Sequence, residues 1–567
     1  MKKKDLFSVL SVFAFSFFVV LIAEYIQLRE FSYVFEFLLE KTGVVAFCTF
    51  IIFLFVMSMI YVTGSTFAGA AVGGGLIYVL SCVEFYKFEI SGSHLVIEDL
   101  NFIFNMGEIS GFAEIVPKVH IFRAFAALML LLLLIANVRV RLPGNTVRNI
   151  AGSVLCLALI VAVVSPTSTL AKGYEFFEFD TQPALTTMGM NERFASDGFL
   201  GFLSQNATEY IDSGISAPEG YSQKQMQKLT VEYNGEESLQ SPNIVMILSE
   251  SFADLREISD DASLIPAYEN FDRAADLGSV GVCEVPTFGG YTVRSEFELL
   301  FGLPVMSMSN VASPHSLLDA EKPQNTIVRL LSQNGYRTCY IHPFDETFYN
   351  RSDVYSLYGF DKMIFDAEFD LSQDMYRRYV SDRAVFQKVK DQLCASDESS
   401  FVFAMTMQNH QPYIEEGGSI NGELEYYLEG ISESSDALYE FLMWVESFDE
   451  DTVVLFVGDH FPFFTPQGAV YERLGDGREY SAEVYRQKYI LYANFSKLEA
   501  FDGTVSLFYL PHMILDKTGA VKTDFTKTVL AEMINTPRYG IASFSGRRNK
   551  RLDALTYDRT LGECYVK

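Results

Sequence analysis

Hydrophobic residues follow two different patterns in the two parts of the chain. Up to about residue 170 they form long continuous runs, and beyond about residue 242 they form short runs separated by polar segments. A helix needs roughly 20 apolar residues to cross a hydrocarbon layer of about 30 Å. The first pattern therefore predicts an N-terminal bundle of five transmembrane helices, at about Leu6–Tyr25, Gly43–Val62, Phe67–Val83, Ile121–Val138 and Ile150–Ser165.

Charged residues in the loops between these runs predict the orientation of the bundle. Five spans place two sets of basic residues on one side of the membrane: Lys2, Lys3 and Lys4, and Arg139, Arg141 and Arg148. The loop on the other side is acidic and carries Glu89, Glu98, Asp99 and Glu108. Basic loops stay in the cytoplasm. We therefore expect a multi-pass protein of the cytoplasmic (inner) membrane, with everything after about residue 170 extracytoplasmic.

The second pattern predicts an α/β domain. Short continuous apolar runs are typical of strands buried on both faces. They occur at Asn243–Leu248, Ser279–Val285, Tyr336–Ile341, Phe401–Met407, Thr452–Val457 and Gln487–Ala493. Helical patterns such as Thr326–Asn334 and Ser432–Glu446 lie between them. This alternation predicts a mostly parallel sheet with helices on both faces.

Composition changes along the chain predict the domain limits. We expect a transmembrane anchor (1–170), a polar linker (171–241), a catalytic domain (242–530) and a C-terminal tail (531–567). The stretch Asn191–Ser213 in the linker is amphipathic and could form a helix close to the membrane. The basic cluster in the tail favours a solvated or lipid-facing segment.

Overall charge and cysteine spacing exclude several classes of function. With 72 acidic and 43 basic residues the formal net charge is -29, which argues against a nucleic-acid partner. No two of the seven cysteines form a CxxC pair, which disfavours a zinc knuckle or a thioredoxin-like site. A disulfide among Cys283, Cys339, Cys394 and Cys564 is open, since spacing does not assign a pairing.

Polar residues that can bind a metal follow several predicted strands. Glu250, Asp459 with His460, His410 and His342 each come shortly after a strand. In open α/β sheets, ligands bind beyond the carboxyl ends of the strands. Carboxylate and imidazole ligands suit Mn or Zn. Any one of these residues alone could be a helix cap or a satisfied polar residue, but their joint placement indicates a metal site.

Thr292 is the candidate nucleophile. Gly289 and Gly290 allow a sharp turn before it, and a helix is expected to begin there. The amides at a helix N-terminus favour a phosphate group, and a metal lowers the pKa of a bound hydroxyl. The alternative is that Thr292 only caps the helix, and the residue pattern leaves both open.

Five motifs give the chain a wider resemblance. They are PNIVMILSESF, GGYTVRSEFELLFGLP, HPFDETFYNRSDVYSLYGFD, TMQNHQPY and VGDH. In this order and spacing, the sequence resembles the lipoteichoic acid synthase and phosphoglycerol transferase family, a branch of the alkaline phosphatase and sulfatase superfamily. The agreement runs from the anchor to about residue 520. It implies a sulfatase-like fold for the extracytoplasmic domain.

The resemblance also implies an activity and a set of site residues. Glu250, Thr292, Asp459 and His460 would hold one divalent metal, usually Mn2+ in this family, with Zn2+ or Mg2+ as alternatives. Thr292 would attack phosphatidylglycerol, release diacylglycerol and pass phosphoglycerol to an envelope glycan, glycolipid or polyglycerolphosphate acceptor. His342, Tyr349, Arg351 and His410 match substrate-binding positions. Without the resemblance, Arg351 would be read as a surface ion pair with Asp353 or a neighbour.

Two departures from the family pattern leave donor and acceptor open. Tyr291 stands where synthases of the Gram-positive polymer tend to have Lys, and Tyr349 where they tend to have Trp. The closest rival is a phosphoethanolamine transferase, followed by a phosphodiesterase and a non-catalytic membrane scaffold. A sulfatase is disfavoured because no C/S-x-P-x-R motif surrounds Thr292. A transporter is disfavoured because little buried charge is expected in the spans.

Overall fold

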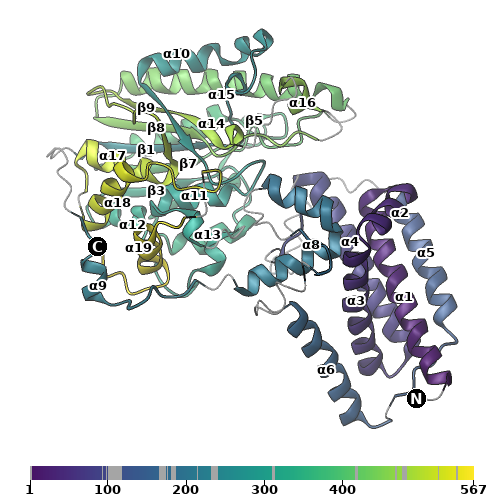
Figure 1. The fold of residues 1–567 in the computed structure, drawn as a ribbon. Helices are drawn as coiled ribbons and strands as arrows, with labels where there is room; N and C mark the ends of the chain where they lie inside the picture. Colours follow the sequence, from purple (N-terminus) through teal and green to yellow (C-terminus); the bar gives the residue numbers. More distant parts are fainter. Residues whose placement is uncertain are drawn as a thin grey trace. The chain divides into compact units, whose positions relative to one another are not determined.

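The structure is a computed structural model that divides into two compact units, Met1–Gly214 and Ile215–Lys567 (Figure 1). The residues it describes are 3–91, 94–97, 99, 118–142, 144–164, 174, 176–180, 187–212, 215–231, 241–308, 313–415, 419–465, 469–475, 482–521, 523–543 and 547–567. Most of the acidic loop therefore lies outside the described residues, as do 171–173, 175, 181–186, 213–214 and 232–240 of the predicted linker.

The first unit is helical, as its long apolar runs predict. Its helices are α1 (Lys3–Leu28), α2 (Phe31–Glu40), α3 (Thr42–Thr63), α4 (Thr66–Ser91), α5 (Val119–Ile135), α6 (Thr146–Val164) and α8 (Thr187–Asp212). Among the described residues, four helices are long and apolar enough to cross a membrane: α1, α3, α4 and α6. The fourth predicted span, Ile121–Val138, corresponds to α5, which has 17 residues and is shorter. The amphipathic stretch Asn191–Ser213 is helical within α8 up to Asp212.

Apolar side chains cover both the inside and the outside of this helical bundle. On α5, Leu130, Leu133 and Leu134 are 57%, 69% and 69% exposed. Inside, α4 packs closely on α3, because a Cβ at Gly69 would lie 2.4 Å from the Ile60 backbone nitrogen. Helices that are apolar all round and that meet through small residues are typical of a membrane domain.

The spans contain buried carboxylates, so the expectation of little buried charge is wrong at two positions. Glu84 in α4 is 0% exposed, and it accepts hydrogen bonds from the His94 ring (2.6 Å) and the Leu95 N–H (2.5 Å). Glu24 in α1 accepts from the Phe199 N–H at 3.2 Å. Both carboxylates are therefore satisfied by partners of the chain itself.

The second unit is built on an eight-stranded sheet with the order β10-β2-β9-β8-β1-β7-β3-β4. The strands are β1 (Asn243–Ser249), β2 (Ser279–Glu284), β3 (Arg337–Ile341), β4 (Lys362–Ile364), β7 (Ser400–Met405), β8 (Thr452–Gly458), β9 (Arg486–Ala493) and β10 (Thr504–Ser506). All six predicted strands are present. Only β9 runs against its neighbours, so the sheet is mixed but mostly parallel.

Helices cover both faces of this sheet (Figure 1). One layer contains α10 (Glu269–Leu277), α14 (Asp382–Leu393) and α15 (Glu423–Glu446). The other contains α11 (Thr292–Phe301), α12 (Ile327–Ser332), α17 (Leu510–Thr518), α18 (Asp524–Asn535) and α19 (Lys550–Thr560). Shorter helices are α9 (Gln223–Gln227), α13 (Arg351–Ser356) and α16 (Val470–Gly475), and β5 (Met375–Tyr376) and β6 (Tyr379–Val380) form a small hairpin.

The end of the chain packs onto this domain. In α19 the side chains of Leu552 and Leu555 are 0% exposed, and Arg551 forms an ion pair with Glu532. The segment expected as a solvated or lipid-facing tail thus contributes to the core. All seven cysteines are free thiols.

Candidate metal centre and nucleophile

Four adjacent strands carry the candidate site residues at one edge of the sheet. In the order β8, β1, β7, β3, their carboxyl ends lead to Asp459 and His460, then Glu250, then His410, then His342. Parallel pairing aligns these ends, with Ser249 opposite Gly458 and Leu248 opposite Met405. The parallel register therefore brings together residues that lie up to about 200 positions apart in the chain.

The absence of a side chain at Gly458 allows the ends of β1 and β8 to meet. A Cβ added there would lie 1.8 Å from the carbonyl oxygen of Phe252, far inside van der Waals contact. Any other residue would push the two segments apart. Glycine at this point thus sets how closely Glu250 and Asp459 approach each other.

Asp459 is held in place by hydrogen bonds to both of its oxygens. Oδ1 accepts from the backbone N–H groups of Ser251 (2.7 Å) and His460 (2.8 Å), and Oδ2 accepts from the Thr292 hydroxyl at 2.8 Å. Its backbone carbonyl accepts from the Ser295 hydroxyl at 2.8 Å. The carboxylate is 0% exposed, so it is a fixed element of the site.

Thr292 is the first residue of α11 and does not cap the helix. The cap position is Tyr291, which has left-handed backbone angles (φ 58°, ψ 43°) and makes no side-chain cap. The left-handed Tyr291 turns the chain so that the Thr292 hydroxyl meets Asp459, with Glu250 Oε2 at 3.4 Å. The alternative that Thr292 serves only as a cap is therefore wrong. Its hydroxyl lies between two carboxylates at a helix N-terminus.

His460 presents a lone pair to these carboxylates. Its Nδ1 lies 2.8 Å from the Phe461 carbonyl, which can only accept, so Nδ1 carries the proton. Nε2 is then an acceptor, and it lies 3.1 Å from Asp459 Oδ2 and 3.8 Å from Glu250 Oε1. Nε2 is buried and has no hydrogen-bond partner. Three buried acceptors therefore face one another, which a cation between them would resolve.

The ligand atoms of Glu250, Asp459 and His460 all lie within 4.8 Å of one another, so this group could hold a metal ion. Two carboxylates and one imidazole are ligands suited to Mn or Zn. Burial raises the pKa of Asp459 to about 7. Burial and the neighbouring Asp459 raise the pKa of Glu250, and burial lowers the pKa of His460. These directions express the cost of charge in a dry site, which a bound cation would offset.

Comparison with known proteins identifies the second unit. The family model described as Sulfatase matches residues 242–520. This region is a domain of the sulfatase and alkaline phosphatase superfamily. In structure it is similar to the Streptococcus pyogenes phosphoglycerol transferase GacH, determined in complex with sn-glycerol-1-phosphate. The TM-score is 0.51 at 20% identity, over 62% of this chain and 97% of that one.

Two curated relatives share part of the sequence. A Rhizobium meliloti (strain 1021) protein named for cyclic beta-1,2-glucan modification is 26% identical over 350 residues, which is 56% of this chain and 52% of that protein. A lipoteichoic acid synthase of Staphylococcus saprophyticus is 26% identical over 199 residues, covering 33% of this chain and 30% of the synthase. The chain thus matches about half or less of the length of these relatives.

A second buried group in the sulfatase domain is centred on Glu296, one helical turn after Thr292. Its carboxylate accepts hydrogen bonds from the hydroxyls of Tyr340 (2.9 Å) and Tyr355, and Arg351 Nη2 lies 3.3 Å from it. Arg351 is 1% exposed. The simple reading of Arg351 as a surface ion pair with Asp353 is therefore wrong, because its partner is the buried Glu296.

Tyr349, predicted as a substrate-binding residue, lies beside Arg351. Tyr349 and Asn350 both adopt left-handed backbone angles (φ 56° and 53°) just before α13 begins at Arg351. The Arg351 guanidinium lies 5.2 Å from the centre of the Tyr349 ring. The guanidinium is thus held from one side by a carboxylate and from another by an aromatic ring.

The two remaining predicted substrate residues are the histidines that follow β3 and β7. His342 is 1% exposed, and neither ring nitrogen has a hydrogen-bond partner. Burial and the charge of Arg351 hold its pKa well below the ordinary value. His410 is half-buried, with Nδ1 at 2.7 Å from the Gln411 carbonyl and 3.2 Å from the Tyr379 hydroxyl.

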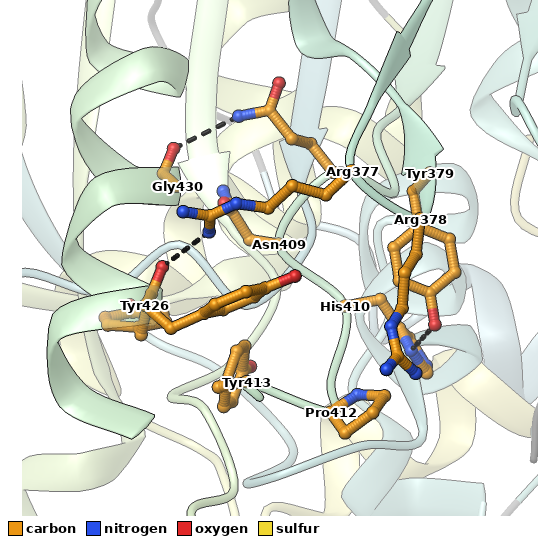
Figure 2. Close-up of a pocket in the computed structure, with 11 residues that line it drawn as sticks. Arg377, Arg378, Tyr379, Asn409, His410, Pro412, Tyr413, Tyr426 and Gly430 are labelled. Carbon is orange, nitrogen blue, oxygen red and sulfur yellow. Dashed lines mark hydrogen bonds between the residues drawn. The ribbon is translucent and has the colours of Figure 1, made fainter. Parts of the chain in front are cut away.

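Some residues of the site region were not predicted from the sequence. A pocket beside His410 is lined by Arg378, Tyr379 and Tyr413, among others (Figure 2). Glu296 was also missed, although its spacing of four residues from Thr292 places both on one helix face. The helical spacing was thus a usable signal for Glu296, and the motif TMQNHQPY contains Tyr413, whereas no local pattern marks Arg378 or Tyr379.

Proposed function

We propose that the chain is a membrane-anchored, metal-dependent transferase that moves phosphoglycerol from phosphatidylglycerol to an envelope acceptor through an ester on Thr292. The observation that carries this proposal is the Thr292 hydroxyl, which donates to Asp459 at 2.8 Å and begins a ten-residue helix. A nucleophile at this position has a carboxylate to receive its proton, and it lies at a helix N-terminus, which favours a phosphate.

Each residue near Thr292 has a role in this proposal. Asp459 accepts the hydrogen of the Thr292 hydroxyl in the resting state, and its two backbone hydrogen bonds fix its position. Glu250, Asp459 and His460 would hold the cation together with Thr292, and we propose Mn2+. A bound divalent cation supplies positive charge that stabilises the threonine alkoxide and the phosphate oxygens.

We propose that residues around the buried Glu296 and Arg351 bind the substrate. Arg351 is oriented by Glu296, and its Nε has no hydrogen-bond partner in this buried position. A guanidinium suits phosphate oxygens. His342, with two unpartnered nitrogens, can bond the hydroxyls of glycerol. We propose that Tyr349, Arg351, His342 and His410 bind the phosphoglycerol group.

The membrane context supports a lipid donor. The apolar helices of the first unit keep the sulfatase domain attached to the bilayer that contains phosphatidylglycerol. Basic residues near the N-terminus and at Arg139, Arg141 and Arg148 favour the cytoplasm for those loops. We therefore propose that the sulfatase domain is extracytoplasmic, where envelope glycans, glycolipids and polyglycerolphosphate chains are found.

The test follows the donor half-reaction. Purified full-length protein with Mn2+ is incubated with phosphatidylglycerol labelled in its head group, and diacylglycerol release and label on the protein are measured. We expect both for the wild type and neither for Thr292→Ala, whereas the matched Thr292→Ser keeps a hydroxyl and retains part of the activity.

Three outcomes would contradict parts of the proposal. Release that persists in Thr292→Ala excludes the ester on Thr292. Label transfer from phosphatidylethanolamine in place of phosphatidylglycerol establishes the phosphoethanolamine alternative. If metal-loaded protein acts on neither lipid, a non-catalytic scaffold replaces the transferase.

A further inference from the structure

A pocket adjoins the metal centre on the side of β7. Its wall is formed by the β5–β6 hairpin, the segment after β7 and the first turns of α15 (Figure 2). Two contacts connect the elements of this wall to Glu250 and its neighbour Ser251. Thr406, just after β7, accepts the Glu250 N–H at 3.1 Å, and Tyr427 of α15 donates to the Ser251 carbonyl at 2.9 Å. The pocket thus lies on segments that contact the proposed metal ligand Glu250 and Ser251.

Two arginines at the turn of the hairpin differ in their partners. Arg377 stacks on the Tyr426 ring (3.7 Å to its centre), donates to the Tyr426 carbonyl at 2.8 Å and forms an ion pair with Glu429. Figure 2 shows it extended toward α15. Its charge is therefore neutralised within the domain.

Arg378 lines the same pocket and keeps its charge available. It donates to the Ile414 carbonyl at 3.3 Å and forms no ion pair with any carboxylate in the part of the chain that the structure describes. The side chain is exposed and lies with Tyr379 on the side of the pocket away from Arg377 (Figure 2). A cation without a countercharge, next to a phosphotransfer centre, attracts an anionic ligand.

The inner wall of the pocket carries a tyrosine hydroxyl close to the metal ligands. Tyr413 is 3% exposed, and its hydroxyl interacts with the Ser251 side chain and lies near Glu250. The neighbouring Ser251 donates its own hydrogen to Glu250 at 2.8 Å. The Tyr413 ring is fixed between Tyr427 (5.2 Å) and Phe464 (5.4 Å). A hydroxyl of a bound ligand could exchange hydrogen bonds with Tyr413 at this position.

We propose that this pocket binds the acceptor, and that the acceptor carries a negative charge close to the hydroxyl that it presents. A terminal glycerol phosphate and an acidic sugar share this chemistry. Arg378 would bind the anion and Tyr413 a hydroxyl. The proposal rests on the proposed function, because it concerns the second half of that reaction.

In the second half of the proposed reaction, phosphoglycerol passes from Thr292 to the acceptor hydroxyl. The acceptor oxygen attacks the phosphorus of the phosphoglycerol ester, a new P–O bond forms and the P–O bond to Thr292 Oγ1 breaks. The acceptor hydroxyl loses a proton and the Thr292 oxygen regains one. A pocket that positions the hydroxyl beside Glu250 places it next to the residues that hold the ester.

The test compares a charged and a neutral acceptor. Full-length protein with Mn2+ and phosphatidylglycerol is given sn-glycerol 1-phosphate or glycerol, and transfer to each is measured. We expect the wild type to prefer the phosphate. In Arg378→Gln, the ratio of kcat/KM for glycerol 1-phosphate to that for glycerol should fall about tenfold, mainly through KM.

A matched control is Arg383→Gln, which removes an exposed arginine that is paired with Glu440 and does not line the pocket. It should leave the ratio unchanged. A ratio unchanged in Arg378→Gln, or one that falls equally in both variants, overturns the proposal. Methyl glucuronide as a third acceptor separates the two sources, since a loss confined to one anion identifies phosphate or carboxylate as the group that Arg378 binds.

Failure of the proposed function is detected separately. If the wild type releases no diacylglycerol, the donor step is wrong, and the pocket is tested by binding alone. Calorimetry with sn-glycerol 1-phosphate on the Thr292→Ala chain should then show affinity about tenfold weaker with the added Arg378→Gln change. Equal affinity in the two chains overturns the anion pocket whatever the donor is.

Discussion

Buried carboxylates occur in both units, and their partners differ. In the first unit, Glu84 accepts hydrogen bonds from the His94 ring and a backbone N–H, and Glu24 accepts one from the N–H of Phe199. In the sulfatase domain, Glu250 and Asp459 face the lone pair of His460, a group that offers them no proton. Donors of the chain bond both pairs, but only the second pair also faces an acceptor, the unprotonated Nε2 of His460.

The partners of a buried carboxylate distinguish a structural role from a metal-binding role better than its burial does. All four carboxylates are nearly inaccessible to water. A buried acid whose oxygens are satisfied by donors stabilises the fold around it. Buried acids that face another acceptor raise the energy of the empty site, and they are stabilised when a cation binds. The following predictions test this contrast, from the largest expected effect to the smallest.

Asp459→Asn should weaken Mn2+ binding by about a thousandfold, more than the 10–100-fold typical of changes beyond the direct ligands. The amide oxygen can still accept the two backbone N–H groups, so the domain should stay folded. Binding is measured by calorimetry on the full-length protein. Asp451→Asn, an exposed change next to β8, is the control, and unchanged affinity in Asp459→Asn would remove Asp459 from the metal centre.

Glu296→Gln should lower the free energy of unfolding of the sulfatase domain by about 3 kcal/mol, because it leaves Arg351 buried without a countercharge. The single tryptophan, Trp444 in α15, reports the unfolding of this domain within the whole chain. Asp319→Asn breaks the exposed pair with Lys322 and should cost at most about 0.5 kcal/mol. Equal losses in both variants would mean that Glu296 and Arg351 are not a buried pair.

Mn2+ affinity should rise about tenfold between pH 6 and pH 8. Burial raises the pKa of Asp459 to about 7, so at pH 6 the cation must displace a proton that is absent at pH 8. Dissociation constants at the two pH values, with proton release measured in two buffers, check this. The slope should vanish in Asp459→Asn, and a flat profile in the wild type would contradict the raised pKa.

Glu298→Gln should stabilise the sulfatase domain at pH 8 by on the order of 1 kcal/mol, with no gain at pH 4. Burial raises the pKa of Glu298 to about 8, above its value in the unfolded chain. The folded state therefore keeps a proton that the unfolded state releases, and stability is lost as the pH rises from about 4.5 to about 8. Glutamine removes this loss and can still accept the Val305 N–H.

Denaturant unfolding of the wild type and of Glu298→Gln, followed by Trp444 fluorescence at pH 4 and pH 8, measures the change in the free energy of unfolding. Glu269→Gln, the same substitution at an exposed position, provides the control for the change of side chain itself. A gain that is the same at pH 4 and pH 8 would show that the change acts through packing and not through the proton.

The strands could be predicted because strands buried on both faces consist of continuous runs of apolar residues. The central strands β1, β7 and β8 are buried along their whole length and appear as continuous apolar runs. The direction of β9 could not be predicted, because hydropathy is the same whichever way a strand runs. The end of α5 was predicted at Val138, three residues beyond its last residue Ile135, because apolar residues continue past that point.

The site was predictable where ligands follow strands and unpredictable where partners come from elsewhere. Glu250, Asp459 and His460 lie together as their strand ends indicated. The pairing of Arg351 with Glu296 depends on two left-handed residues before α13 and on burial between tyrosines, and no local pattern records either. The pocket at Arg378 depends on three segments that meet only in the folded domain.

Gly458 has a consequence for how this site can evolve. A Cβ at this position would overlap the Phe252 carbonyl, so even alanine is excluded unless the backbone of one strand moves. The spacing of the proposed metal ligands is therefore tied to a position that cannot be altered in small steps. Descendants of this chain can vary the proposed acceptor pocket, because Arg377 and Arg378 at its hairpin turn are exposed, while the distance between the ends of β1 and β8 stays constant. New specificities should accumulate at the hairpin and not at the metal.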